Sequence, residues 1–121
     1  MADLSSKAKN IKLVATDIDG VWTDATMYVT PDGDWMKAFS TYDGMAVSML
    51  KKKGLIVAIL TSENTDIVLA RSKKLKIEEV YVDEHEKLKR LIYLSKKYKI
   101  SMDEVAYIGD DVNDLDALKA V

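Results

Sequence analysis

The fold prediction starts from residues 13–24, which read Leu13-Val14-Ala15-Thr16-Asp17-Ile18-Asp19-Gly20-Val21-Trp22-Thr23-Asp24. A short apolar run that suits a β-strand leads into two aspartates one residue apart and then into a glycine. This pattern predicts a buried strand that ends in a tight loop, with Asp17 and Asp19 at its carboxyl end. Two like charges this close are costly to bury unless a cation lies between them, and Mg²⁺ is the hard divalent cation that best suits carboxylate oxygens.

Two other interpretations of this stretch remain open on these residues alone. A solvated Asp-Gly turn has the same composition and needs no ligand. A calcium loop fits less well, because Ile18, Val21 and Trp22 stand where such a loop has ligands or polar residues. The rest of the chain therefore has to decide between a turn and a metal site.

Composition narrows the class of protein. The chain has 121 residues, of which 48% are hydrophobic and 31% charged, which predicts one soluble globular domain. Its net charge of −2 and its dispersed lysines argue against nucleic-acid binding, and no apolar run approaches the length of a membrane span. There is no cysteine, and residues 1–10 are polar and lack the apolar segment of a secretory signal. We therefore expect a cytoplasmic protein without disulfides.

Strands and helices are expected to alternate along the chain. Residues 1–10 read as a flexible tail, and 11–121 as a single domain. The expected strands cover residues 11–16, 55–60, 80–82 and 105–108, and the expected helices cover 44–53, 65–75, 86–98 and a last one from about 115. Met45 and Met49 are expected to fill the core from the first of these helices. This alternation predicts an α/β fold with a doubly wound (Rossmann-like) parallel sheet.

A β-hairpin is expected to interrupt this alternation directly after the first strand. Residues 25–40 contain two β-compatible arms around the turn residues Pro31-Asp32-Gly33. The arms carry six large apolar side chains, which are Met27, Tyr28, Val29, Trp35, Met36 and Phe39. A free two-stranded ribbon cannot bury so much apolar surface, so we expect the hairpin to pack against copies of the chain.

Polar residues follow the carboxyl ends of all four expected strands. Asp17 and Asp19 follow the first strand, Thr61 the second, Lys87 the third and Asp110 the fourth. Ligands of open α/β sheets bind at this edge, so these side chains are expected to meet. Carboxylates, a hydroxyl and a lysine around one cation form a set of groups suited to phosphoryl transfer.

These residues resemble the motifs of the haloacid dehalogenase superfamily of aspartyl phosphatases. The matching motifs are Asp17-Ile18-Asp19-Gly20, Thr61, Lys87 and Gly109-Asp110-Asp111-Val112-Asn113-Asp114. The resemblance implies that Asp17 is the nucleophile, which forms a phospho-aspartate, and that Asp19 is the general acid/base. It also implies that Mg²⁺ is held by Asp17, Asp110 and the backbone carbonyl of Asp19.

The same resemblance assigns the remaining motif residues. It implies that Thr61 and Lys87 bind the phosphate group. It also implies that Asp111 and Asp114 hold the metal site and the lysine in place without binding the metal ion themselves.

The resemblance is narrower than the superfamily. Residues 19–24, the hairpin after them and the short spacing to Thr61 resemble small phosphatases without a cap domain that act on phosphorylated 2-keto-3-deoxy sugar acids. Octulosonate 8-phosphate phosphatases of this group usually carry Gly-Arg after that threonine, whereas this chain has Ser62-Glu63-Asn64, which is more similar to nonulosonate 9-phosphate phosphatases. Glu63 would then bind sugar hydroxyls, and Arg71 and Lys74 the sugar carboxylate. A solvated helix face is an equally open interpretation of these two cations.

The resemblance also implies an assembly and a chain length. In this group the hairpin builds a homotetramer, which we expect here as well. Such phosphatases continue past the helix of the last motif into a further strand and a C-terminal tail. Residues 11–121 are therefore expected to form the phosphatase domain without that strand and tail.

Two other functions compete with the Mg²⁺-dependent phosphatase. One is a non-catalytic, phosphatase-like tetramerisation module of a sialic acid activating enzyme, which the presence of Asp17, Asp19, Lys87 and Asp110 disfavours. The other is a phosphoacceptor signalling domain, which the Asp-x-Asp-Gly signature and the hairpin disfavour. The eight-carbon octulosonate 8-phosphate remains the alternative substrate.

Overall fold

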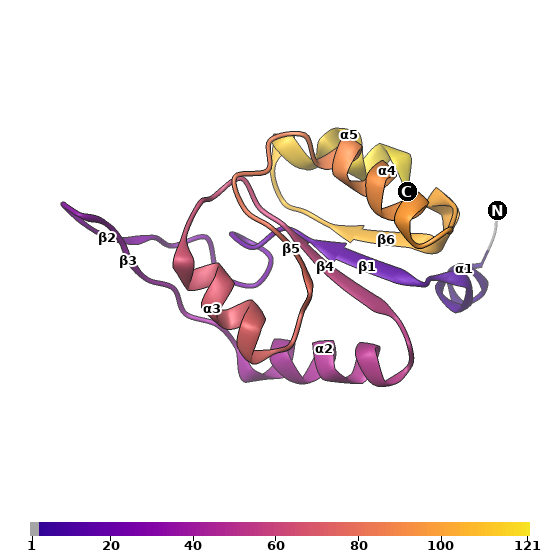
Figure 1. Cartoon of the computed structure of the whole chain (residues 1–121), viewed down its shortest axis with the longest axis horizontal. Coiled ribbons are helices and arrows are strands. Elements are labelled where there is room, and N and C mark those ends of the chain that lie inside the picture. Colours follow the sequence, from indigo (N-terminus) through magenta and orange to yellow (C-terminus); the bar gives the residue numbers. More distant parts are fainter. Residues whose placement is uncertain (1–2) are drawn as a thin grey trace.

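A computed structural model describes residues 3–121, and its centre is a parallel sheet of four strands in the order β5-β4-β1-β6. The strands are β1 (Leu13–Thr16), β4 (Ile56–Leu60), β5 (Glu79–Tyr81) and β6 (Val105–Ile108). In the register, Val14 of β1 lies between Val57 and Ala106. These strands are almost continuously apolar because helices cover both faces of the sheet. Figure 1 shows their carboxyl ends gathered at one edge.

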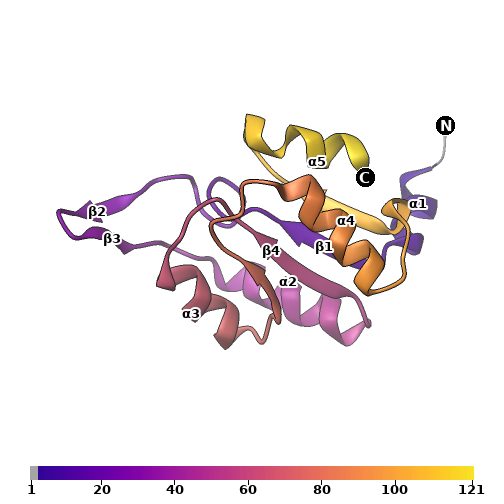
Figure 2. The same ribbon diagram turned by 45° about the horizontal axis from the view of Figure 1, so that its top comes forward.

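Four helices cover the sheet, two on each face, as Figures 1 and 2 show. They are α2 (Thr41–Lys52) and α3 (Asp66–Lys74) on one face and α4 (Lys87–Lys97) and α5 (Leu115–Ala120) on the other. Val47 of α2 and Val68 of α3 belong to one buried cluster, and Leu91 of α4 and Ala117 of α5 belong to the other. The α/β doubly wound fold expected from the sequence is confirmed.

The expected hairpin is also confirmed. It consists of β2 (Tyr28–Thr30) and β3 (Gly33–Met36), which pair antiparallel and project from the body of the domain (Figure 1). All residues of both strands are exposed, and Trp35 and Val29 each expose 63% of their surface. Among residues 3–121, this hairpin is the insertion between β1 and α2, and no cap domain is present.

Part of the segment expected to be a flexible tail, residues 1–10, is helical. Leu4–Asn10 forms the helix α1, which begins where the Asp3 carboxylate accepts a hydrogen bond from the amide of Ser5. Polar helix-forming residues after a capping aspartate explain this local helix. No residue of α1 is buried, and residues 1–2 lie outside the described part of the chain.

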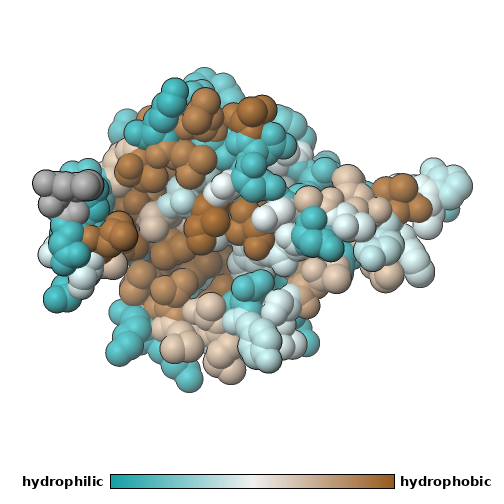
Figure 3. Space-filling model, turned by 180° about the vertical axis from the view of Figure 1, so that it is seen from behind, coloured by the Kyte–Doolittle hydropathy of each residue, from teal (hydrophilic) through white to brown (hydrophobic). Residues whose placement is uncertain are grey.

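The prediction that Met45 and Met49 fill the core is wrong. Each exposes 61% of its surface, whereas Val47, between them in sequence, is buried. Helix α2 starts at Thr41 because the Ser40 side chain caps it, and the helix then turns the two methionines outward. Met49, Leu50 and Leu55 line one apolar hollow beside α2, and Val14, Leu50 and Ile108 line another over β1 and β6. Figure 3 shows the apolar surface on this face of the molecule.

A polar cluster fixes the opposite edge of the sheet. Glu79 on β5 is only 5% exposed, and its carboxylate accepts hydrogen bonds from Tyr81, Lys97 and Tyr98. Burial alone would raise the pKa of Glu79, but these hydrogen bonds outweigh it and hold the pKa below its usual range. The carboxylate therefore ties edge strand β5 to the end of α4.

None of the helices among residues 3–121 combines the length and the apolar character needed to cross a membrane.

Candidate active site

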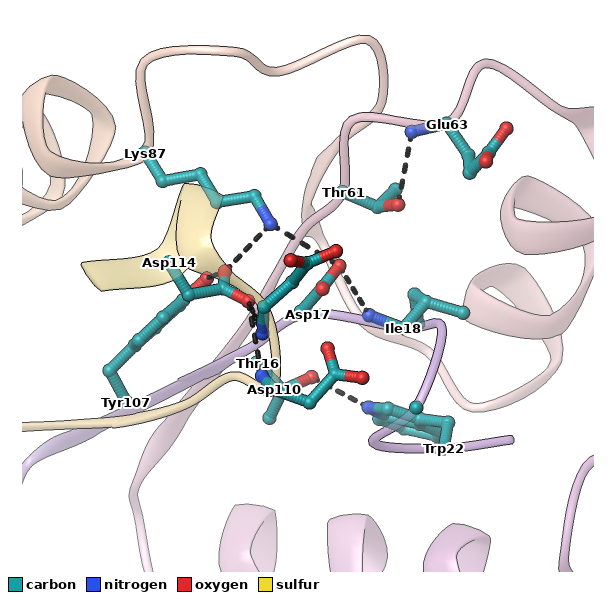
Figure 4. Close-up of polar contacts among 12 residues, drawn as sticks. Thr16, Asp17, Ile18, Trp22, Thr61, Glu63, Lys87, Tyr107, Asp110 and Asp114 are labelled. Carbon is teal, nitrogen blue, oxygen red and sulfur yellow. Dashed lines mark hydrogen bonds and ion pairs between the residues drawn. The ribbon is translucent and has the colours of Figure 1, made fainter. Parts of the chain in front are cut away.

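Three carboxylates from two loops meet at the carboxyl edge of the sheet (Figure 4). Asp17 follows β1 directly, and Asp110 and Asp114 belong to the segment between β6 and α5. One oxygen from each side chain lies within 4.8 Å of the others. Strands β1 and β6 are neighbours in the sheet, which is why residues 93 positions apart in the chain come together.

The nucleophile expected from the sequence, Asp17, is buried. It is 6% exposed, and its Oδ1 accepts a hydrogen bond of 2.8 Å from the amide of Ile18. The same oxygen lies 3.4 Å from Nζ of Lys87. Burial raises the pKa of Asp17 above its ordinary value, against the opposing effects of the Ile18 amide and Lys87. A nearby cation would lower this pKa and keep the carboxylate ionised.

Asp114 is fully buried and holds Lys87 in place. Its Oδ1 lies 2.7 Å from Lys87 Nζ and also accepts a hydrogen bond from the Tyr107 hydroxyl. Its Oδ2 accepts hydrogen bonds from the backbone amides of Asp110 and Asp111, at 3.1 and 3.2 Å. Burial would raise the pKa of Asp114, but the bonds from Lys87, Tyr107 and the Asp111 amide outweigh it and lower the pKa. Asp114 is therefore a charged anchor with all its acceptor positions occupied.

The excess of negative charge at this site favours a divalent cation. Asp17, Asp110 and Asp114 carry three negative charges when ionised, and Lys87 supplies one positive charge. Both oxygens of Asp114 are engaged, and Oδ1 of Asp17 accepts from the Ile18 amide, so Oδ2 of Asp17 and the carboxylate of Asp110 are the oxygens best placed to bind an ion. An all-oxygen donor set of this kind suits a hard cation such as Mg²⁺.

Two glycines allow the loops to approach so closely. Gly20 adopts a φ of +84°, and a Cβ atom there would lie 1.7 Å from Oδ2 of Asp110. A Cβ atom at Gly109 would lie 2.4 Å from Cγ of Asp114. Any side chain at either position would displace a carboxylate of the site.

The loop after β1 is held by its own tryptophan. The indole Nε1 of Trp22 donates a hydrogen bond of 2.6 Å to the hydroxyl of Thr16, and both side chains are buried. The amides of Val21 and Trp22 donate to the carbonyl of Ile18, which closes the turn. Trp22 also packs in the α2–α3 core, so the loop that carries Asp17 and Asp19 is rigidly attached to the domain.

Thr61 lies on the neighbouring loop, directly after β4 (Figure 4). Its side chain is 1% exposed, and its hydroxyl accepts a hydrogen bond of 3.2 Å from the amide of Glu63. Both residues stand at the same edge of the sheet as Asp17, as the sequence predicted.

The three remaining candidate residues lie on α3 and on the loop after β6. On α3, the guanidinium carbon of Arg71 lies 5.7 Å from the centre of the Phe39 ring, and the guanidinium group donates a hydrogen bond of 3.4 Å to the carbonyl of Ser40. These two contacts join Arg71 to the segment before α2. Lys74 is exposed in the last turn of α3, at the end of the helix that points away from the carboxyl edge of the sheet. Asp111 is exposed and caps the short 3₁₀ helix η2 (Val112–Asp114), while its amide supports Asp114.

Sequence reasoning missed two residues that bind the site's carboxylates. Tyr107 on β6 donates to Asp114, and the Nζ of Lys37 lies 2.8 Å from Oδ1 of Asp19. Tyr107 lies at an inward-facing position of β6. The alternation along this strand predicts that its side chain is buried, but not that it contacts Asp114. Lys37 comes from the foot of the hairpin, and the sequence holds no signal for where a hairpin folds back.

The family of the chain follows from comparison with known proteins. The sequence profile of the haloacid dehalogenase-like hydrolases matches residues 37–121. The chain belongs to this family, and its four-stranded sheet with the hairpin insertion agrees with the fold of the solved relatives.

Proteins described as phosphatases are among its relatives. The 3-deoxy-D-manno-octulosonate 8-phosphate phosphatases KdsC of Escherichia coli (strain K12) and Haemophilus influenzae are each 34% identical to it, over 99% and 97% of the chain. The chain spans only 64% and 65% of the length of these two relatives. A crystal structure of the corresponding phosphatase from Moraxella catarrhalis, in complex with magnesium ion, phosphate ion and KDO, matches 96% of this chain and 67% of that chain with a TM-score of 0.91 and 39% identity.

Proposed function

We propose that this chain is the catalytic domain of a Mg²⁺-dependent phosphatase that hydrolyses a phosphorylated 2-keto-3-deoxy sugar acid. The observation that carries the proposal is the buried Asp17 carboxylate beside Lys87 and Asp110, in a haloacid dehalogenase-like fold. The named activities of the relatives support the substrate class.

The metal ion would be held by the carboxylates of Asp17 and Asp110 and by the backbone carbonyl of Asp19. When bound, Mg²⁺ neutralises phosphate charge and keeps the carboxylate of Asp17 ionised next to the phosphorus atom. Lys87, fixed by Asp114, supplies a second positive charge, and the hydroxyl of Thr61 is available to bind a phosphate oxygen. Positioning and charge stabilisation of this kind are the main catalytic effects in phosphoryl transfer.

The reaction would proceed in two balanced steps. In the first, a carboxylate oxygen of Asp17 attacks phosphorus, the bond from phosphorus to the sugar oxygen breaks, and Asp19 gives that oxygen a proton. In the second, Asp19 takes a proton from water as the water oxygen attacks phosphorus. The bond from phosphorus to Asp17 then breaks, which releases inorganic phosphate, restores the carboxylate of Asp17 and leaves Asp19 protonated for the next turnover.

Two observations favour different sugars within this class. The relatives named above favour the eight-carbon 3-deoxy-D-manno-octulosonate 8-phosphate. The tripeptide Ser62-Glu63-Asn64 favours a nine-carbon nonulosonate 9-phosphate, because Glu63 stands where the eight-carbon enzymes usually carry arginine. The ratio of kcat/KM for the two substrates decides between them, and Glu63→Arg is expected to shift this ratio toward the eight-carbon substrate.

The domain would act as a homotetramer through its hairpin. The hairpin exposes Met27, Tyr28, Val29, Trp35 and Met36 by 42–63% each, which is more apolar surface than an isolated ribbon can keep in water. Closed symmetric association would cover this surface and place a neighbouring copy near each open site.

Phosphate release in the presence and absence of Mg²⁺ tests the proposal. We expect the wild type to release phosphate from keto-deoxy sugar-acid phosphates, and excess chelator to stop the reaction until Mg²⁺ is restored. Asp110→Ala should weaken Mg²⁺ binding, and Asp17→Asn should abolish release because an amide cannot form the acyl phosphate. A folded wild type with no activity toward any such ester would favour a non-catalytic assembly module. Stoichiometric phosphorylation without turnover would favour a phosphoacceptor domain.

A further inference from the structure

Lys37 is a buried lysine that neither the motifs nor the mechanism above account for. It follows the last residue of β3, at the foot of the exposed hairpin. Its side chain is only 1% exposed, and its Nζ lies 2.8 Å from Oδ1 of Asp19. The partners are 18 residues apart in the chain, so the hairpin has to fold back on the catalytic loop to form this pair.

Burial of an ammonium group is unfavourable unless a charged or strongly polar partner compensates it. Among residues 3–121, the acidic group that pairs with Lys37 is the carboxylate of Asp19. Lys87, the other lysine of the site, is engaged by Asp114 and Asp17 instead. Each of the two reacting carboxylates, Asp17 and Asp19, thus has a buried lysine of its own.

The pair also separates Asp19 from the cluster that can hold a cation. That cluster consists of Asp17, Asp110 and Asp114, and the side chain of Asp19 is not part of it. A divalent cation at the cluster would attract a fourth carboxylate two residues from Asp17. A side chain drawn to the ion would no longer be in reach of the leaving oxygen.

We propose that Lys37 is a positioning residue, which holds the Asp19 side chain away from the metal ligands and beside the leaving sugar oxygen, so that the protonated form of Asp19 gives its proton to that oxygen. This inference rests on the proposed phosphatase function. Lys37 touches neither the phosphorus atom nor the leaving group in this proposal, and it acts only through Asp19.

Two phosphate esters with different leaving groups provide the test. A sugar alkoxide needs a proton to leave, whereas the p-nitrophenolate of p-nitrophenyl phosphate leaves without one. The rate of leaving-group release in the first turnover is measured for both esters at saturating Mg²⁺. This step precedes hydrolysis of the phospho-aspartate, so it isolates the proton donation.

For Lys37→Met we expect first-turnover release from the sugar phosphate to fall by about 10²-fold, the effect of misplacing a reacting group by about 1 Å. Release from p-nitrophenyl phosphate should change by less than about threefold, and KM for the sugar phosphate by a similarly small factor. Lys37→Arg, which can still reach Asp19, should restore most of the rate. Lys12→Met serves as the control, because Lys12 forms an exposed ion pair with Glu104.

Other outcomes would overturn the proposal. An equal loss on both esters with a raised KM would mean that Lys37 binds the phosphate directly. A fully active Lys37→Met would mean that the pair is only structural. If this variant does not fold, Lys37→Gln is measured in its place, with the same expected contrast between the esters. If the wild type is active and Lys37→Met either loses activity equally on both esters or stays fully active, only this inference is rejected. A wild type that is inactive on both esters rejects the proposed function and this inference with it.

Discussion

Replacement of Asp114 by asparagine tests the central electrostatic arrangement of the site. Asp114 is 0% exposed and accepts four hydrogen bonds, two on each oxygen. An asparagine has one acceptor oxygen and one NH₂ group, so in either orientation two of the four donors face another donor. Each lost hydrogen bond to a charged acceptor costs about 1.5–3 kcal/mol.

The expected loss of unfolding free energy is therefore about 3–6 kcal/mol, which overlaps the range of about 3–5 kcal/mol that is usual when a buried ion pair is broken by removing one partner. For a chain of 121 residues this corresponds to a fall in Tm of roughly 12–24 °C. Asp111→Asn is the matched control, because Asp111 lies three residues away and is exposed. Its substitution should cost less than about 0.5 kcal/mol.

Urea and thermal unfolding, followed by circular dichroism in buffer with a chelator, measure these differences without a contribution from ion binding. A double-mutant cycle with Lys87→Met separates the ion pair from the other contacts of Asp114. We expect a coupling of about 1–3 kcal/mol between the two substitutions. A Asp114→Asn variant as stable as Asp111→Asn, or additive effects in the cycle, would refute the view that Asp114 anchors Lys87.

Three further predictions follow from the same structure. Gly20→Ala should lower Mg²⁺ affinity and phosphate release more than it lowers Tm, because the added Cβ would displace the Asp110 carboxylate. Unchanged Mg²⁺ binding, measured by calorimetry, would contradict this prediction. The pKa of Glu79 is lower in the folded state, so its contribution to stability is present above about pH 4.3, the ordinary glutamate pKa, and is lost as the pH falls below it. Glu79→Gln should flatten stability against pH in that acid range, and an unchanged slope would argue against the assignment. If the chain forms the proposed tetramer, replacement of Trp35 and Met36 by charged residues should dissociate it and raise KM. Light scattering that shows a monomeric wild type with full activity would exclude this role of the hairpin.

The sequence predicts the sheet and the grouping of polar residues at its carboxyl edge well, because both depend on local patterns. Apolar runs mark the four strands, and Asp17, Thr61, Lys87 and Asp110 follow them directly, so parallel pairing alone brings these residues to one edge. The hairpin is equally local, since a Pro-Asp-Gly turn separates its arms.

The features that the sequence does not predict depend on tertiary packing. Met45 and Met49 have helical spacing, but spacing does not tell which face of α2 meets the sheet, and Val47 is the residue that does. The Lys37–Asp19 pair depends on how the hairpin folds back, and the contacts of Arg71 with Phe39 and Ser40 depend on how α3 packs. None of these relations is encoded at short range in the chain.

The claim that Asp17 becomes phosphorylated during turnover has one most direct test. The chain is mixed with Mg²⁺ and a keto-deoxy sugar-acid phosphate, quenched with acid within the first turnover, digested and analysed by mass spectrometry. We predict one added phosphoryl group on the peptide that contains Asp17, and its loss when the reaction is allowed to finish. The Asp17→Asn variant should carry none. Phosphate release by the wild type at full rate, with no phosphorylated peptide at any quench time, would contradict the account.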